Sequence, residues 1–233
     1  MSTYFPFHAS GFQCNPFRAL TLDEWAEVAI VPEPVEAALS AGFVHVQILG
    51  EKGTGKTSAL LALTRRWTRE GKRVSYEYLP EGRSAFQTDP KGLDFFALDE
   101  AQRLSARERR RLLSLASRSP GRPGLILGSH EDFAPLFSRH ALPLAGVRVD
   151  TPTDAHTAVV LQRRLAYFAL TGKAPATLTP GALRYVQERF GADLREAEHF
   201  LYEVYQRLRP DGPVEAAQLL QAAAIIAEGT ETG

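Results

Sequence analysis

One stretch decides the fold of this chain: Gly50-Glu51-Lys52-Gly53-Thr54-Gly55-Lys56-Thr57. It fits the P-loop pattern G-x-x-x-x-G-K-[ST] at every fixed position. The apolar run 43–49 before it predicts a strand, and the Ala- and Leu-rich segment 58–70 after it predicts a helix. In this context, backbone N–H groups of the loop and the positive end of the helix surround a phosphate.

The P-loop pattern gives individual positions a role. The Lys56 ammonium would contact the β- and γ-phosphates of a nucleotide, and the Thr57 hydroxyl would hold Mg²⁺. ATP and Mg²⁺ are therefore the expected cofactors. The candidate nucleotide-binding residues of this stretch are Gly50, Glu51, Lys52, Gly53, Thr54, Gly55, Lys56, Thr57 and Ser58.

The composition excludes several protein classes. The chain has 233 residues, 44% hydrophobic and 23% charged, which is typical of a globular protein with a sizeable core. No apolar run approaches the ~18–20 residues of a membrane span, and the N-terminus lacks a secretory signal. One cysteine, Cys14, excludes a disulfide framework and a Cys-based zinc site. We expect a cytoplasmic protein with no membrane partner.

Further strands and helices follow the P-loop in alternation. Strands are predicted at 73–79, 93–100, 125–130 and 147–150, and helices between them at 105–117 and 132–138. Because apolar strands interleave with helices, we expect an α/β fold with a buried parallel sheet of five strands, as in P-loop NTPases.

The strand 93–100 ends in two acids, Asp99 and Glu100. A carboxylate at the carboxyl end of a parallel strand beside a P-loop can hold Mg²⁺ through water, and the next one can polarise the attacking water. Asp99 is the candidate metal ligand, together with Thr57, and Glu100 is the candidate catalytic base. The strand 125–130 has a polar tip as well, so Ser129 or His130 would face the γ-phosphate.

The sequence pattern predicts four regions of the chain. Residues 1–42 form a leader that packs on the core, 43–150 form the core, 151–229 form a small all-α lid domain, and 230–233 form a disordered tail. Helices of the lid are expected at 154–171, 179–190, 193–208 and 214–228. Within the leader, Phe17 lines the adenine of a bound nucleotide or anchors the leader onto the core.

The order of these motifs resembles the AAA+ ATPase family over most of the chain. In that family the lid carries a sensor arginine at the start of its third helix, and the segment 191–195 resembles this element, which implies that Arg195 lies over the phosphates. The alternative is an exposed arginine in a first helical turn. In that family, one subunit also donates an arginine to the ATP of its neighbour, and this arginine lies just before the fifth strand. Arg139 matches that position, and Arg148 is the alternative.

The compact core and the leader look most like the initiator and clamp-loader side of the family, which includes helicase-loading and transposon target-selection ATPases. Between residues 101 and 122 there are seven arginines and one acid. Such a cluster suits phosphate contacts with duplex DNA. The alternatives are a solvated helix face or pairing with acids of a neighbouring subunit. The candidate DNA-binding residues are Arg107, Arg109, Arg110 and Arg111.

Two functions follow from these patterns. The first is an AAA+-type ATPase that binds and hydrolyses ATP at a subunit interface, as an ATP-dependent homo-oligomer, to drive assembly or remodelling of a DNA-associated complex. The catalytic candidates are Glu100, Lys56, Arg139, Ser129 and Arg195. The second is a nucleotide-gated switch of low turnover that presents a surface to an unidentified protein partner and does not bind DNA.

Overall fold

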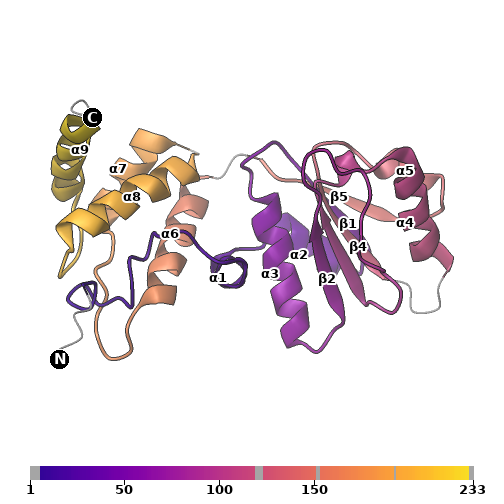
Figure 1. The fold of residues 1–233 in the computed structure, drawn as a ribbon, viewed down its shortest axis with the longest axis horizontal. Helices are drawn as coiled ribbons and strands as arrows, with labels where there is room; N and C mark the ends of the chain where they lie inside the picture. Colours follow the sequence, from indigo (N-terminus) through magenta and orange to yellow (C-terminus); the bar gives the residue numbers. More distant parts are fainter. Residues whose placement is uncertain (1–5, 119–122, 151–152, 192, 231–233) are drawn as a thin grey trace. The chain divides into compact units, whose positions relative to one another are not determined.

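The computed structural model describes residues 6–118, 123–150, 153–191 and 193–230 (Figure 1). The chain divides into two compact units. Residues 21–151 form the first, which we call the sheet unit, and residues 1–20 together with 152–233 form the second, which we call the helical unit. Within the described ranges, none of the helices has both the length and the apolar character needed to cross a membrane.

The sheet unit contains five parallel strands in the order β2-β3-β4-β1-β5. The expected five-stranded parallel sheet is thereby confirmed. Four of the strands lie close to their predicted positions, whereas the fifth begins three residues earlier because Gly146 interrupts the apolar pattern there. The strands are β1 (His45–Leu49), β2 (Val74–Tyr78), β3 (Phe95–Asp99), β4 (Gly124–Ser129) and β5 (Leu144–Arg148).

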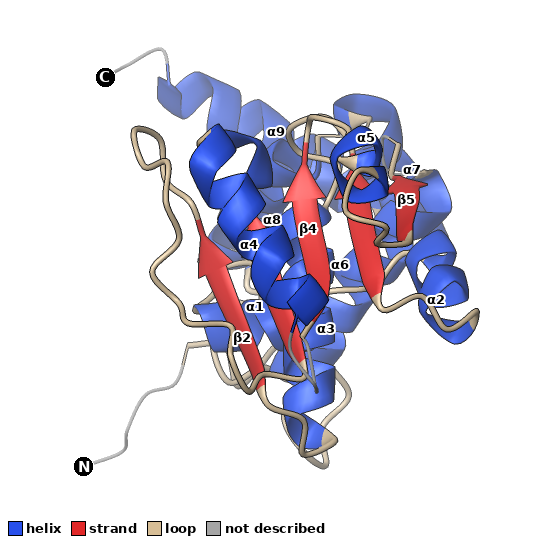
Figure 2. Ribbon diagram, turned by 90° about the vertical axis from the view of Figure 1, so that its right-hand side faces the viewer, coloured by secondary structure: helices blue, strands red, loops and turns tan. Residues whose placement is uncertain are grey.

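Helices cover both faces of the sheet (Figures 1 and 2). Successive side chains of a strand point to opposite faces, so alternate residues enter two separate cores. Val46 and Ile48 of β1 pack against α2 and α3, while Phe96 and Leu98 of β3 pack in the core that includes α4 and α5. The helices of this unit are α1 (Leu22–Val28), α2 (Glu33–Ser40), α3 (Lys56–Arg69), the 3-10 turn η1 (Ala101–Arg103), α4 (Ala106–Arg118) and α5 (Ala134–Ser138).

The parallel arrangement places three chain segments at one edge of the sheet. β1 pairs with β4 with Leu49 opposite Ser129, and β4 pairs on its other side with β3. The residues that follow these strands are Gly50, His130 and Glu100. Because parallel strands all end at the same edge, the P-loop, the acid pair and the polar tip of β4 meet there.

The helical unit consists of four helices and the segment 6–20. Side chains cap three of the helices: Thr153, Thr179 and Asp193 each accept a hydrogen bond from a first-turn N–H group. These caps explain why the predicted boundaries lie near the observed ones. The helices are α6 (Asp154–Phe168), α7 (Pro180–Phe190), α8 (Leu194–Leu208) and α9 (Ala216–Thr230).

The leader divides between the two units, with residues up to Leu20 in the helical unit and those from Thr21 in the sheet unit, and the packing of all of 1–42 on the core stays a prediction. Phe12 and Phe17 lie edge-to-face on Tyr205 of α8 in the core of the helical unit. The buried Arg164 of α6 donates from Nε to the Pro16 carbonyl at 2.7 Å and pairs with Glu198 at 2.7 Å. A polar anchor and an aromatic cluster therefore hold this segment on the lid.

The expected tail 230–233 falls largely on residues that the structure does not describe. Only Thr230 lies within the described ranges, as the last residue of α9. The proposal of a disordered tail stays a prediction from the sequence.

Candidate nucleotide site

The P-loop runs from the end of β1 to the start of α3. Two of its glycines, Gly53 and Gly55, have φ angles of 91° and 89°, in the left-handed region that favours glycine. Gly55 is the N-cap of the 14-residue helix α3. The first-turn N–H groups of this helix lack partners within it, so the loop presents N–H donors and the positive end of a helix to an anion.

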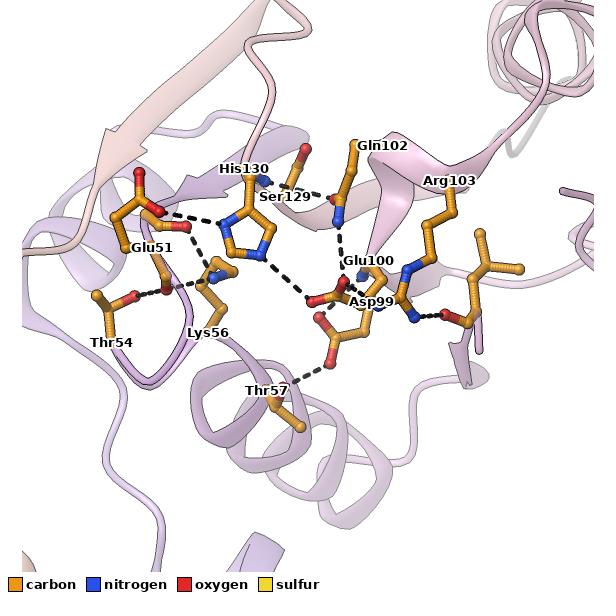
Figure 3. A network of polar contacts seen from close by, with 12 residues as sticks. Glu51, Thr54, Lys56, Thr57, Asp99, Glu100, Gln102, Arg103, Ser129 and His130 are labelled. Atoms are coloured by element: carbon orange, nitrogen blue, oxygen red, sulfur yellow. Dashed lines mark hydrogen bonds and ion pairs between the residues drawn. The ribbon is translucent and has the colours of Figure 1, made fainter. Parts of the chain in front are cut away.

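Lys56 is folded back onto the loop that precedes it. Its ammonium donates to the carbonyls of Gly50 and Glu51 at 2.8 and 2.7 Å, and the side chain is buried (Figure 3). Burial lowers the pKa of Lys56, and the carboxylates of Glu100, Asp99 and Glu51 partly oppose that shift. The ammonium therefore sits among oxygen atoms at the mouth of the loop, which suits a phosphate oxygen as an additional partner.

Thr57 and Asp99 form the candidate magnesium site. The Thr57 hydroxyl donates to Asp99 Oδ2 at 2.6 Å, so two hard oxygen donors lie side by side, as Mg²⁺ requires. Burial raises the pKa of the Asp99 carboxyl, while the Thr57 hydrogen bond acts in the opposite direction. Gly128 of β4 makes room for this group, because a Cβ there would lie 2.7 Å from Asp99 Oδ1. The residues present fit the metal.

Tyr76 of β2 is a member of this site that the sequence did not reveal. Its hydroxyl donates to Asp99 Oδ2 at 3.3 Å. Burial and the neighbouring Asp99 carboxylate raise the pKa of Tyr76, so the phenol stays protonated and available as a donor. The β-rich pattern of 73–79 predicted the strand but not the partner of this side chain.

Glu100 adopts a backbone conformation that is uncommon for a residue with a side chain. Its φ and ψ are 58° and 38°, in the left-handed region, and it is the N-cap of η1. Such a conformation costs about 1–2 kcal/mol. The Glu100 N–H group donates to Asp99 Oδ1 at 3.0 Å, which offsets part of this cost. Oε2 of the Glu100 carboxylate accepts a hydrogen bond from Gln102 Nε2 at 2.9 Å and forms an ion pair with the Arg103 guanidinium at 2.9 Å.

His130, rather than Ser129, faces the candidate base. The Ser129 hydroxyl is buried and bonded to the backbone of Glu131, both as donor and as acceptor at 2.9 Å. The imidazole of His130 lies between two carboxylates, with Nε2 3.7 Å from Glu100 Oε1 and Nδ1 3.9 Å from Glu51 Oε2 (Figure 3). Of the two alternatives at this strand tip, His130 is the one that lies beside Glu100, and the contact of either residue with a γ-phosphate stays a prediction.

Comparison with known proteins fits this architecture. No family model matches the sequence, and no curated protein matches it. A RuvB variant from Thermotoga maritima is similar in structure, with a TM-score of 0.59 and 17% identity over 90% of this chain and 73% of that chain. Cdc6p from Pyrobaculum aerophilum has a TM-score of 0.53 and 16% identity over 82% and 67%. These neighbours are AAA+ ATPases. The chain has the AAA+ fold.

A third AAA+ structure was solved with nucleotides bound. It is the ORC2 protein of Aeropyrum pernix, in ADPNP and ADP complexes, with a TM-score of 0.50 and 14% identity over 82% of this chain and 64% of that chain. At such identities the likeness concerns the fold, and the roles of individual side chains have to come from this chain's own geometry.

The arginines that the AAA+ resemblance singled out are exposed. Arg139 follows α5 as its C-cap, and Arg148 is the last residue of β5. Arg148 pairs in register with Leu49, directly before the P-loop of its own chain, and the choice between Arg139 and Arg148 stays a prediction. Arg195 lies in the first turn of α8, in the helical unit. Its sensor role stays a proposal, and Ala192 of the same motif lies outside the described residues.

Phe17 lies in the helical unit, and its place in the nucleotide site stays a prediction. Its side chain is only 4% exposed, it packs on Tyr205, and the Arg164 guanidinium lies 5.7 Å from its ring centre. A ring enclosed in this way has little surface left for adenine. Of the two roles considered for Phe17, anchoring is the one its contacts match, although the anchor is on the helical unit.

The basic segment divides into engaged and exposed arginines. Arg109 donates to both oxygens of Glu131 at 2.7 Å and to the carbonyls of Leu104 and Gln102, so its guanidinium serves the fold. Arg111 pairs with Glu108 at 3.0 Å. Of the four candidate DNA contacts, Arg107 and Arg110 remain the better ones, since both are exposed and Arg110 donates from Nε to the Ala106 carbonyl of its own helix.

Proposed function

We propose that this chain binds ATP with Mg²⁺, hydrolyses it at a boundary between subunits, and uses the cycle to drive assembly or remodelling of a DNA-associated complex. One observation carries the proposal. The carboxyl edge of an AAA+ sheet brings a buried P-loop lysine, a Thr–Asp oxygen pair, a carboxylate and a histidine into one network (Figure 3). Each of these groups has a place in phosphoryl transfer to water.

Each residue of the site has a proposed role that follows from its position. Lys56 would exchange its loop carbonyls for phosphate oxygens, and Thr57 and Asp99 would hold Mg²⁺, which neutralises phosphate charge when bound. Glu100 would accept a proton from the attacking water through Oε1, because Oε2 is already engaged by the hydrogen bond from Gln102 and the ion pair with Arg103. His130 would contact the γ-phosphate from the neighbouring strand. Arg195 would reach the phosphates from the lid.

Assembly would complete the site. Arg139 is exposed, so it could reach the ATP of an adjacent copy. Arg139→Ala is expected to leave ATP binding by the monomer intact and to lower the concentration-dependent ATPase rate about 10³-fold or more, because an arginine donated in trans contributes ~10³–10⁵ to the rate. The measurement is phosphate release over a range of protein concentrations. Binding of a non-hydrolysable ATP analogue is measured at the lowest of these concentrations.

The control for this variant is Arg83→Ala, which removes an exposed arginine from the loop after β2. A wild-type rate per molecule that does not change with protein concentration would reject an arginine donated in trans. A full loss of rate in Arg148→Ala together with normal activity of Arg139→Ala would transfer the role to Arg148.

DNA binding is expected to depend on salt and on the exposed side of α4. The double variant Arg107→Ala with Arg110→Ala should weaken binding to a short duplex and reduce the magnitude of the slope of log K against log [salt] by about 2, since each phosphate contact contributes roughly 0.9. Titrations of a labelled duplex with a non-hydrolysable ATP analogue, at several salt concentrations, measure this slope. Arg83→Ala is again the control, and an unchanged slope would place any DNA contact elsewhere.

A second candidate function keeps the nucleotide site and omits DNA. It is a nucleotide-gated protein-interaction switch with low turnover, and the internal engagement of Arg109 and Arg111 favours it because it reduces the free positive charge of α4. Absence of ATP-dependent duplex binding at low salt would select this alternative. Partner capture that requires ATP but no duplex would support it directly.

A further inference from the structure

A single side-chain amide joins the ends of β3 and β4. Gln102 Nε2 donates to Glu100 Oε2 at 2.9 Å, and Gln102 Oε1 accepts from the backbone N–H of His130 at 3.4 Å (Figure 3). The two polar ends of one amide therefore connect the candidate base to the candidate γ-phosphate contact. A glutamine in the 3-10 turn that follows an acid pair carried no signal in the sequence.

The backbone of Gln102 is itself held in place. The Gln102 carbonyl accepts a hydrogen bond from Arg109 Nη2 at 2.5 Å. The same guanidinium donates to both carboxylate oxygens of Glu131, the residue after His130, at 2.7 Å each. Arg109 thus forms hydrogen bonds to the same two chain segments that Gln102 connects, the segment after β3 and the segment after β4. A bidentate arginine–carboxylate pair fixes direction as well as distance. The contact from α4 therefore restricts where the amide of Gln102 can lie.

This arrangement determines which oxygen of Glu100 is presented. Oε2 accepts a hydrogen bond from Gln102 and is paired with the Arg103 guanidinium, each at 2.9 Å. Oε1 faces the His130 imidazole at 3.7 Å, which is beyond direct hydrogen-bond distance. One hydrogen bond and one ion pair on Oε2 therefore orient the carboxylate, and the other oxygen faces His130.

We infer that Gln102 is a positioning residue for hydrolysis, holding Glu100 Oε1 in line with a water molecule and at a fixed spacing from His130. The inference rests on the proposed ATP hydrolysis and names a residue that acts through Glu100 and does not touch ATP. Arg103 restrains the same oxygen of Glu100, but Gln102 alone of the two also reaches His130. Arg109 supports this function from α4.

Gln102→Met tests the inference, because it keeps the length of the side chain and removes both hydrogen bonds. We expect kcat to fall about 10–100-fold, since misplacement of a reacting group by ~1 Å can cost about 100-fold. The Kd of a non-hydrolysable ATP analogue and the melting temperature should stay unchanged. Gln102→Asn, which has the amide but lacks one methylene, should show the same loss. Gln87→Met, in an exposed loop of the same unit, is the matched control.

Combining Gln102→Met with Glu100→Gln distinguishes a positioning role of Gln102 from a general structural effect. If Gln102 acts through Glu100, Gln102→Met should not lower the residual single-turnover rate of Glu100→Gln any further. Losses that multiply would overturn the inference, as would a weaker analogue Kd or a lower melting temperature in Gln102→Met alone. Normal kcat in Gln102→Met beside an inactive Glu100→Gln would reject the role of Gln102 and leave ATP hydrolysis standing. Normal turnover in Glu100→Gln would reject the hydrolytic site itself.

Discussion

Lys56→Ala is expected to weaken ATP binding about 100-fold or more and to remove measurable turnover. The lysine is buried at the mouth of the P-loop, with its ammonium already surrounded by the carbonyls of Gly50 and Glu51. A charged hydrogen bond contributes about 1.5–3 kcal/mol, and each 1.4 kcal/mol is a tenfold change in affinity. Loss of two such bonds to phosphate oxygens would cost about 3–6 kcal/mol, which corresponds to about 100-fold or more in affinity. The measurement is analogue binding by calorimetry together with phosphate release.

The variant needs a control for lost positive charge and one for lost structure. Lys91→Ala removes a lysine from an exposed loop of the sheet unit and should bind ATP normally. Far-ultraviolet circular dichroism and the melting temperature of Lys56→Ala check that α3 is still formed. Unchanged ATPase activity in Lys56→Ala would end the assignment of residues 50–57 as the phosphate-binding loop.

Glu100→Gln is expected to retain ATP and to lower turnover about 10²–10⁴-fold, which is the usual contribution of a general base. Glutamine has nearly the same size and its amide oxygen can still accept the hydrogen bond from Gln102, so the turn after β3 should persist. Loss of a negative charge close to the triphosphate should not weaken binding. Single-turnover hydrolysis and retention of labelled ATP after gel filtration measure the two effects.

Glu81→Gln, in the loop after β2, serves as the control for a lost carboxylate. It should hydrolyse ATP at the rate of the unmodified protein. If Glu100→Gln turned over ATP normally, the base would have to be another group. Loss of ATP binding in Glu100→Gln would also contradict the role proposed here, because a base is required for the chemical step and not for the affinity.

The sheet and the core of the site were predictable because both depend on short stretches of sequence. The P-loop spacing specifies a strand, a turn and a helix, and apolar runs of four to six residues specify buried parallel strands. Once the strands are parallel, Asp99 and Glu100 must lie at the same edge as Lys56. The contact between Thr57 and Asp99 then follows from topology rather than from any detail of packing.

The remaining side-chain partners depend on directions that the sequence does not contain. Ser129 and His130 are equally polar neighbours, and only the turn after β4 decides that one bonds its own backbone while the other faces Glu100. Gln102 and Arg109 belong to a polar turn and to a basic helix, where many residues of the same type are exposed. Their functions depend on which atoms of distant segments they reach, and periodicity carries no information about that.

The leader illustrates a different limit. Its aromatic residues predicted an anchor, but an aromatic ring packs equally well on any apolar surface that has room for it. The helical unit offers Tyr205 and the guanidinium of Arg164, and these partners are more than a hundred residues away in sequence. Phe17 consequently lies in a core that local patterns could not identify.

The division of the leader also affects how the protein can be cut for expression. Residues 6–20 complete a core whose other members begin at Ala158, so the sheet unit is an insertion within the sequence of the helical unit. A clone that starts at residue 21 would deprive the buried Arg164 of its acceptors on Pro16 and Arg18. An isolated helical unit has to include both pieces, joined by a short engineered connection where residues 21–151 are removed, whereas 21–151 is a continuous fragment.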